Sequence, residues 1–256
     1  MSLPAVSRTA LITGATGGLG RAVAIALAEA GLAVALHHRR SAQAAEELRD
    51  DLAKRGARAT VVIADLSAAD VDAVCARLLD DVAAALAVPD VVVLAAGAQE
   101  VTPWDGLDAA AWDAMYAGTL RHTAVLLHQA AARMRPERQP AIVVVGSVEG
   151  LRAARGHAPY AVAKAALHHL VGAAAEELGP RGIRVVGVAP GLIDRPGLAE
   201  EWPHGHRRWS RAAALGRPVA AAEVAAAIAF LASPGASGIT GVVLPVDAGW
   251  SCAPGW

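Results

Sequence analysis

The sequence predicts an α/β fold of the doubly wound type, with a mostly parallel seven-stranded sheet and helices on both faces. Short β-branched runs alternate with longer alanine-rich segments along all 256 residues. The runs show almost no polar alternation, which indicates strands that are buried on both faces. Because parallel strands need helical connections, the alternation indicates repeated βαβ units.

Seven segments are expected to be strands, and the longer segments between them to be helices. We expect strands at Ala10–Thr13, Ala33–His37, Ala59–Ala64, Val91–Ala95, Ile142–Val145, Arg184–Val188 and Val242–Val246. Helices with an apolar face are expected to include Gly20–Ala30, Ala42–Arg55, Val71–Ala85, Tyr160–Leu178 and Ala222–Leu231. No linker rich in proline or serine and no internal repeat interrupts this order, so we expect one domain over residues 1–256.

Composition and charge exclude several classes of protein. Lys and Arg number 23 against 24 Asp and Glu, without the basic excess of a nucleic-acid binder. Cys75 and Cys252 form neither a disulfide framework nor a zinc motif, as is usual in a reducing cytosol. Apolar runs such as 91–97 are far shorter than the roughly 18 residues of a membrane span, and no secretory signal is evident. We expect a soluble, cytoplasmic protein.

Residues 193–217 interrupt the regular pattern. They include Trp202, Trp209, two histidines and several arginines. Long irregular segments in compact α/β domains are often lids or binding loops, so this segment is predicted to be a substrate lid. A surface excursion without a ligand is the alternative. His204 and His206 lack a cysteine or carboxylate at ligand spacing, so no metal site is expected.

A glycine-rich turn follows the first expected strand and opens the first expected helix. Its sequence is Thr-Gly-Ala-Thr-Gly-Gly-Leu-Gly, from Thr13 to Gly20. Positions without a side chain let the backbone approach a pyrophosphate, whose charge is stabilised at a helix N-terminus. This context predicts a Rossmann-type dinucleotide site. Its expected contacts are Gly14, Thr16, Gly18, Leu19 and Gly20.

The residues after the second expected strand favour NADP(H) over NAD(H). An NAD site usually has an acidic residue here for the ribose 2′-hydroxyl, whereas this chain has His38, Arg39 and Arg40. Arginine binds a 2′-phosphate through charge-assisted hydrogen bonds. A solvated helix start is the alternative. After the third strand, Asp65 and Leu66 are expected at the adenine, although Asp65 would equally serve as a helix cap.

Tyr160 and Lys164 are four residues apart in an alanine-rich segment, so they share one face of a helix. A nearby ammonium favours the phenolate, which predicts a lowered pKa for Tyr160. The phenol can then exchange a proton with a carbonyl or alcohol oxygen during hydride transfer. Ser147, thirteen residues before Tyr160 and just after a strand, is placed to hold the same oxygen.

Together these motifs resemble the short-chain dehydrogenase/reductase family over residues 6 to 250. The matching motifs are Thr13-Gly14-x-x-x-Gly18-x-Gly20, Asp65, Ala96-Gly97, Ser147, Tyr160-x-x-x-Lys164, Pro190-Gly191, Ile239-Thr240-Gly241 and Val246-Asp247. The resemblance implies that Tyr160 is the general acid/base, that Lys164 lowers its pKa and binds the ribose, and that Ser147 orients the substrate. It also implies cofactor contacts at Ala96, Gly97, Pro190, Gly191 and Ile193. A homotetramer or homodimer is expected.

The chain departs from the family pattern at four positions. Ala95 replaces an asparagine after the fourth strand, and Thr119 stands where many members have a catalytic asparagine. Thr119 is therefore the expected fourth catalytic residue, with a hydroxyl in place of an amide. Val186 replaces another asparagine, and Arg195 replaces a threonine that often contacts the nicotinamide.

The resemblance is closest to 3-oxoacyl-carrier-protein reductases and polyketide ketoreductases, which implies NADPH-dependent reduction of a small-molecule ketone. Arg138 and Arg181 fall where such reductases present arginines to an acidic carrier protein, so a tethered substrate is one expectation. Two alternatives stay open. One is an alcohol dehydrogenase that works toward oxidation, and the other is an NADP-binding sensor with weak catalysis.

Overall fold

The central sheet has seven strands, and every neighbouring pair is parallel. The computed structural model describes residues 7–252. The strand order is β3-β2-β1-β4-β5-β6-β9. The strands are β1 (Thr9–Ile12), β2 (Ala33–His38), β3 (Ala59–Ile63), β4 (Val91–Leu94), β5 (Ala141–Val145), β6 (Arg184–Pro190) and β9 (Val243–Val246). The predicted doubly wound α/β fold is confirmed.

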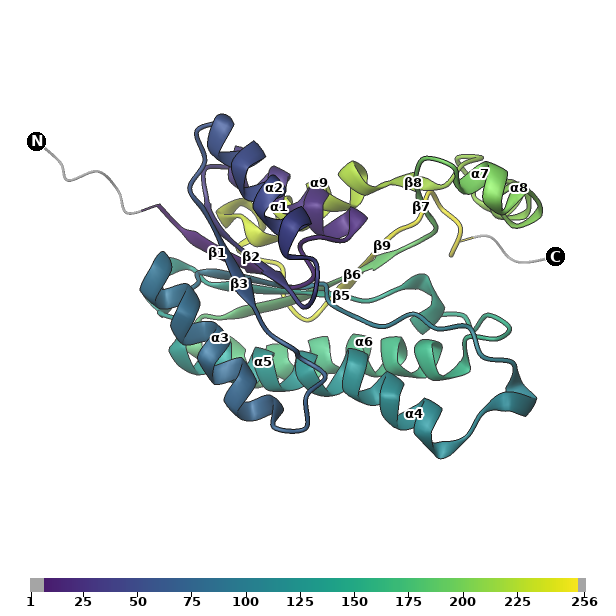
Figure 1. Cartoon of the computed structure of the whole chain (residues 1–256), viewed down its shortest axis with the longest axis horizontal. Coiled ribbons are helices and arrows are strands. Elements are labelled where there is room, and N and C mark those ends of the chain that lie inside the picture. The colour runs from purple at the N-terminus through teal and green to yellow at the C-terminus, as the bar shows by residue number, and fades with distance from the viewer. Residues whose placement is uncertain (1–6, 253–256) are drawn as a thin grey trace, which may run out of the picture.

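Helices cover both faces of the sheet (Figure 1). Helices α1 (Gly18–Glu29), α2 (Ala42–Lys54) and α9 (Ala221–Ala232) lie on one face. Helices α3 (Val71–Ala85), α5 (His122–Arg133) and α6 (Ala158–Leu178) lie on the other, together with the short α4 (Ala109–Met115). A π-helical turn, η2 (Tyr116–Arg121), joins α4 to α5. Short 3₁₀ turns are η1 (Trp104–Gly106), η3 (Pro136–Arg138), η4 (Val148–Gly150), η5 (Gly179–Arg181) and η6 (Pro234–Ala236).

The topology brings distant segments to one edge of the sheet. The direction of winding reverses between β1 and β4, and ligands of open α/β sheets bind beyond the carboxyl ends of the strands at such a point. Four loops follow the carboxyl ends of β1, β4, β5 and β6. They carry the glycine turn, residues 95–97, Ser147 and residues 191–193. The fold therefore gathers most of the predicted site residues at this edge.

Residues 193–217 are more regular than the sequence pattern suggests. They form β7 (Ile193–Asp194), α7 (Leu198–Glu201) and α8 (Pro203–Ala212), and β7 pairs with β8 (Val219–Ala220) in a small parallel sheet. The two helices project at the end of the molecule to which β6 leads (Figure 1). Trp202 is exposed, whereas Trp209 packs against the core.

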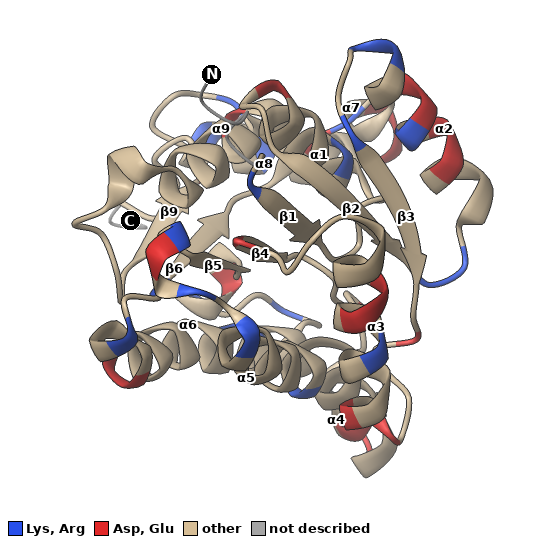
Figure 2. Ribbon diagram, turned by 90° about the vertical axis from the view of Figure 1, so that its left-hand side faces the viewer, with Lys and Arg blue, Asp and Glu red and all other residues tan. Residues whose placement is uncertain are grey.

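Charged side chains of both signs are distributed over the helices and loops, and the strands are almost free of them (Figure 2). This distribution agrees with the nearly balanced composition. No helix within residues 7–252 is long and apolar enough to span a bilayer.

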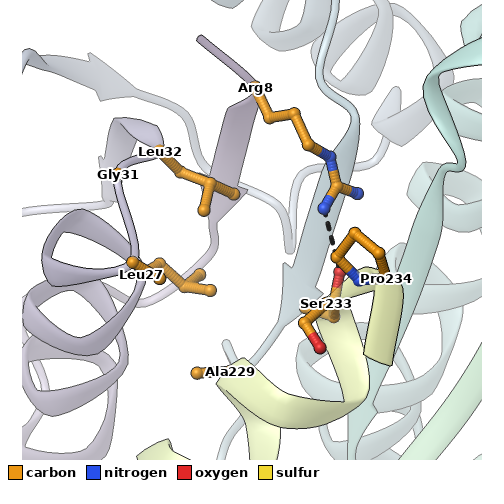
Figure 3. A pocket seen from close by; sticks show the side chains of 9 residues that line it. Arg8, Leu27, Gly31, Leu32, Ala229, Ser233 and Pro234 are labelled. Carbon is orange, nitrogen blue, oxygen red and sulfur yellow. Dashed lines mark hydrogen bonds between the residues drawn. The ribbon is translucent and has the colours of Figure 1, made fainter. Parts of the chain in front are cut away.

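A cavity of about 190 Å³ lies between the ends of α1 and α9, lined by Leu27, Leu32 and Pro234 among others (Figure 3). The Nη1 atom of Arg8 donates to the carbonyl of Ala232 across 3.3 Å. Leu27, which lines the cavity, follows Gly20 by seven residues on α1, so about 10 Å of helix separates this cavity from the glycine turn. The cavity is therefore remote from the sheet edge that gathers the predicted site.

Candidate active site

The glycine turn leaves the N-terminus of α1 open. Gly14 has a φ of +67°, and a Cβ at Gly20 would stand 2.1 Å from the Gly14 carbonyl oxygen. A Cβ at Gly18, in contrast, would meet nothing within 4 Å. Gly17 caps the helix without a side-chain hydrogen bond, and the first turn has no acidic residue. The free N–H groups and the helix dipole therefore suit a phosphate group, which fits the predicted dinucleotide.

His37 supports this turn from β2, and sequence reasoning missed it. The Gly14 N–H donates to Nδ1 of His37 across 3.1 Å, so Nε2 carries the proton and donates to the Ala64 carbonyl at 3.1 Å. Burial lowers the pKa of His37 to about 4, which keeps the ring neutral. An imidazole directly after the apolar run Ala33–Leu36 was the only sequence signal.

Thr13 ties the turn to the end of β4. Its Oγ1 accepts the N–H groups of Ala95 and Ala96 at 2.9 and 3.0 Å. These bonds need only main-chain donors from the 95–96 segment. Alanine at position 95 therefore leaves this connection intact.

Arg39 and Arg40 are exposed beyond the end of β2, whereas His38 is buried with its Nδ1 unpartnered. Arg39 approaches Asp65 at 4.0 Å. The Asp65 carboxylate accepts the Ser67 N–H at 3.0 Å and the Ser67 hydroxyl at 2.6 Å, and these bonds lead the causes that lower its pKa. Asp70, not Asp65, caps α3, which excludes the capping alternative. Leu66 is buried.

Tyr160, Ser147 and Lys164 lie close together at the carboxyl end of β5. Tyr160 and Lys164 lie on α6, and both are buried, as is Ser147 at the end of β5. The Ser147 hydroxyl is near enough to the phenol for hydrogen bonding to count among the causes that lower the pKa of Tyr160. The Lys164 ammonium donates to the Val145 carbonyl at 2.8 Å and lies 5.6 Å from the centre of the Tyr160 ring. The structure therefore brings the three predicted residues together.

The predicted lowering of the Tyr160 pKa is wrong for this structure. Burial raises the pKa of the phenol, the hydrogen bond with Ser147 lowers it, and the charge of Glu149 raises it further. Burial also lowers the pKa of Lys164 to about 8. Desolvation disfavours both charged forms, and it outweighs the stabilisation of the phenolate that the spacing suggested.

Thr119 lies in the π-helical turn, and π-helical turns recur at functional sites. Its side chain is fully buried, and its Oγ1 accepts the Ala98 N–H at 3.1 Å. A Cβ at Gly97 would stand 3.7 Å from both this oxygen and Lys164 Nζ. Thr119 thus lies close to Lys164, while its hydroxyl is engaged with the main chain.

Glu149 and His157 form a half-buried pair next to Tyr160. Nδ1 of His157 lies 2.8 Å from Glu149 Oε2, and the imidazole meets the phenol ring edge to face with centroids 6.2 Å apart. The Glu149 N–H also donates to Ser147 Oγ at 3.1 Å. Sequence reasoning identified neither residue, because their proximity to Tyr160 arises from the loop between η4 and α6.

An aromatic stack joins the predicted lid to the C-terminal segment. The rings of Trp209 on α8 and Trp250 are stacked 4.6 Å apart. The carboxylate of Asp247 accepts the N–H groups of Gly249 and Ser251 at 2.9 and 2.7 Å, which fixes the turn that carries Trp250. A Cβ at Gly191 would stand 2.9 Å from the Trp209 ring. The stack therefore lies against the turn after β6.

The remaining predicted positions have structural partners. Pro190 ends β6, and Ile193 pairs with Val219. Arg195 pairs with Glu201 of α7. Two further arginines, expected to face a carrier protein, are tied to the fold. Arg138 binds Asp90 with two contacts of 2.9 Å, and Arg181 donates to the Ala131 carbonyl at 2.7 Å.

Comparison with known proteins agrees with this geometry. The family model described as enoyl-(acyl carrier protein) reductase matches residues 14–251. An uncharacterized oxidoreductase of Bacillus subtilis, YmfI, is 34% identical over 249 residues, which are 96% of this chain and all of the relative. The cis-4-hydroxycyclohexanecarboxylate dehydrogenase of Sinomonas cyclohexanicum is 37% identical over 245 residues, covering 95% of this chain and 96% of the relative.

Two further proteins extend the comparison. The 3-oxoacyl-acyl-carrier-protein reductase of Pseudomonas aeruginosa is 33% identical over 243 residues, covering 94% of this chain and 96% of the relative. The structure of the angucycline C-6 ketoreductase LanV with bound NADP has a TM-score of 0.89 at 29% identity and covers 97% of both chains. The matched length and these relatives agree with the site geometry, and the chain belongs to the short-chain dehydrogenase/reductase family of oxidoreductases.

Proposed function

We propose that this oxidoreductase reduces a ketone to a secondary alcohol with NADPH, and that Tyr160 is the general acid. The observation that carries the proposal is the cluster of three buried side chains, with Tyr160 and Lys164 on α6 and Ser147 just after β5, in which Lys164 Nζ lies 5.6 Å from the centre of the Tyr160 ring. Burial also raises the pKa of the phenol. A raised pKa keeps the proton on the phenol at neutral pH. A protonated Tyr160 is the form that can donate to a carbonyl oxygen.

The residues of the site have distinct roles in this proposal. NADPH, when bound, would supply the hydride to the carbonyl carbon. Tyr160 Oη donates its proton to the carbonyl oxygen, and the Ser147 hydroxyl holds that oxygen in line. Lys164 binds the ribose, and when charged it stabilises the phenolate that remains after the proton has left. The buried Thr119 hydroxyl oxygen accepts the Ala98 N–H and so holds residue 98 in place.

The preference for NADPH is proposed from the exposed arginines. Arg39 and Arg40 are exposed, and no acidic residue stands at the end of β2. The contacts of Arg39 with Ser67 and Asp65 are long, at 3.4 and 4.0 Å, so a 2′-phosphate could compete for its guanidinium. NADP is also the cofactor bound in the LanV structure. In this proposal Arg39 and Arg40 would hold the 2′-phosphate, the glycine turn the pyrophosphate, Asp65 and Leu66 the adenine, and residues 190–193 the nicotinamide end.

The substrate is proposed to be a 3-oxoacyl or polyketide-type carbonyl compound, by analogy with the reductases among the relatives. We propose that residues 193–217 cover it and that the chain acts as a homodimer or homotetramer in the cytoplasm. A dehydrogenase working toward oxidation is the second candidate. The relative named as a cis-4-hydroxycyclohexanecarboxylate dehydrogenase favours it.

The test is cofactor oxidation, followed by the loss of the reduced-nicotinamide absorbance with NADPH and NADH side by side. The panel contains β-ketoesters, quinones and cyclic ketones, and the reverse assay contains the matching alcohols. Turnover that prefers NADPH and disappears in Tyr160→Phe is the expected result. NADPH binding without turnover in either direction, or turnover that survives Tyr160→Phe, would overturn the proposal.

A further inference from the structure

His168 lies beneath the turn that carries Ser147. It follows Lys164 by one helical turn on α6, and the Ser147 N–H donates to its Nε2 across 3.4 Å. The neighbouring His169 is exposed. Of the two adjacent histidines, His168 is the one that contacts the segment carrying Ser147.

The His168 imidazole packs so closely against Gly146 that it leaves no space for a side chain there. A Cβ on residue 146 would stand 2.2 Å from Nε2 and 2.6 Å from Cδ2 of His168, and its next contact, the Val188 carbonyl oxygen, is at 3.3 Å. Gly146 does not have a positive φ, so its backbone conformation does not demand glycine. The imidazole itself therefore excludes a side chain at the residue before Ser147.

Gly150, at the other end of the turn, is also close to the imidazole, and backbone atoms of α6 lie equally near. A Cβ there would stand 2.7 Å from Cε1 of His168, and also 2.8 Å from the backbone of Lys164. The ring thus lies against both ends of the 146–150 segment. It is wedged between α6, which carries Tyr160, and the turn, which carries Ser147.

The chemistry of the contact requires a neutral ring. A main-chain N–H donates to Nε2 only when that nitrogen holds a lone pair, so the proton must be on Nδ1. Nδ1 is buried without a hydrogen-bond partner. Burial and the charge of Lys164 lower the pKa of His168, which favours the neutral form that accepts from Ser147.

We propose that His168 is a positioning residue, which sets the main-chain position of Ser147 and through it the placement of the Ser147 hydroxyl toward the Tyr160 phenol. The proposal rests on the proposed carbonyl reduction for its catalytic consequence. The contact between His168 and Ser147 does not depend on the substrate. Loss of the imidazole lets the turn move, and a misplacement of about 1 Å costs up to about 100-fold in rate.

The first experiment compares three variants of the full chain by steady-state kinetics with NADPH. His168→Ala removes the acceptor, His168→Gln puts an amide oxygen near the position of Nε2, and His169→Ala is the matched control. We expect His168→Ala to lower kcat by about 10- to 100-fold at unchanged NADPH affinity. His168→Gln should recover most of the rate, and His169→Ala should leave it unchanged. Equal losses in His168→Ala and His168→Gln would overturn the proposal.

The second experiment needs no turnover and separates this proposal from the proposed function. The chain has two tyrosines, so Tyr116→Phe leaves Tyr160 as the sole phenol. Carbon-13 NMR of labelled tyrosine then follows its ionisation. Because the bond with Ser147 lowers the pKa of Tyr160, His168→Ala should raise that pKa and His168→Gln should not. An unchanged pKa in His168→Ala would refute the positioning role, even for a protein inactive on every ketone.

A double-mutant cycle tests the steric part. Gly146→Ala should reduce activity strongly in the wild-type background and much less in His168→Ala, because the imidazole is then absent. Circular dichroism and NADPH binding verify that each variant is folded. An equal effect of Gly146→Ala in both backgrounds would show that another group fills the space.

Discussion

Acidification to about pH 5 is expected to destabilise the folded chain through two buried histidines. His37 holds the glycine turn, and His122 donates from Nε2 to the Gly118 carbonyl at 3.0 Å. Burial lowers the pKa of each from 6.5 to about 4. Both rings are almost inaccessible to water. A proton therefore binds the unfolded chain more readily than the folded one.

The magnitude follows from these pKa values. Above about pH 6.5 both forms are neutral and the folded state keeps its full stability. As the pH falls toward 4, the unfolded state binds about one more proton per histidine, and the free energy of unfolding falls by about 1.4 kcal/mol per pH unit and histidine. At about pH 5 this amounts to roughly 2 kcal/mol for each residue, or about 4 kcal/mol for both. Typical domains have only about 5–15 kcal/mol in total.

Urea unfolding, followed by circular dichroism at several pH values between about 7.5 and 5, measures the effect. Carboxylates titrate mainly below this window, so histidines dominate it. His37→Asn keeps an acceptor near Nδ1 and removes the titration, so its stability should fall less steeply by about 1.4 kcal/mol per pH unit. The exposed His128 supplies the control, and His128→Asn should follow the wild type. Parallel curves for wild type and His37→Asn would refute the reasoning.

Three further predictions concern the cofactor, the acid and the lid. Replacing Arg39 and Arg40 with alanine should lower the affinity for NADPH by about 10- to 100-fold and that for NADH little, because each lost charge-assisted bond costs about 1.5–3 kcal/mol. Fluorescence titration of both cofactors measures the two affinities, and an equal loss for both contradicts the prediction. Glu149→Gln removes a charge that raises the pKa of Tyr160, so the pH profile of alcohol oxidation should shift to lower pH. A profile that stays in place or shifts to higher pH would show that the Glu149 charge does not raise this pKa. Trp250→Ala removes the ring that stacks on Trp209 of α8 and should raise KM for the ketone by about two- to tenfold, since aromatic pairs contribute about 0.5–1.5 kcal/mol. A change in NADPH affinity with an unchanged KM for the ketone would contradict a role of the stack in substrate binding.

The buried strands and the long helices were predictable from sequence. Helix 71–85 has the predicted limits, and the strands differ from expectation by one or two residues at their ends. Continuous apolar runs and helical periodicity carry this information locally. Ala109–Arg133 was not among the predicted helices. The π-helical turn at 116–121 shifts the helical phase there, which interrupts the 3.6-residue pattern.

The site was predictable only in part. The order of motifs located Ser147, Tyr160, Lys164 and the glycine turn at one sheet edge, because these residues follow directly from strand ends and helical spacing. The supporting contacts were not predictable. His37 bonds a residue 23 positions away and His168 one 21 positions away, so these partners emerge only from tertiary packing. The pKa of Tyr160 likewise depends on burial by distant segments.

The stack of Trp209 on Trp250 has a consequence for how the protein matures on the ribosome. The glycine turn and the residues that support it come from the first hundred residues, whereas the stack on α8 depends on Trp250. A nascent chain leaves the ribosome from its N-terminus at about 5–20 residues per second, so the glycine turn emerges many seconds before Trp250. If the first hundred residues fold before the rest, a nucleotide bound at the glycine turn would stabilise them by mass action before the substrate side of the site exists.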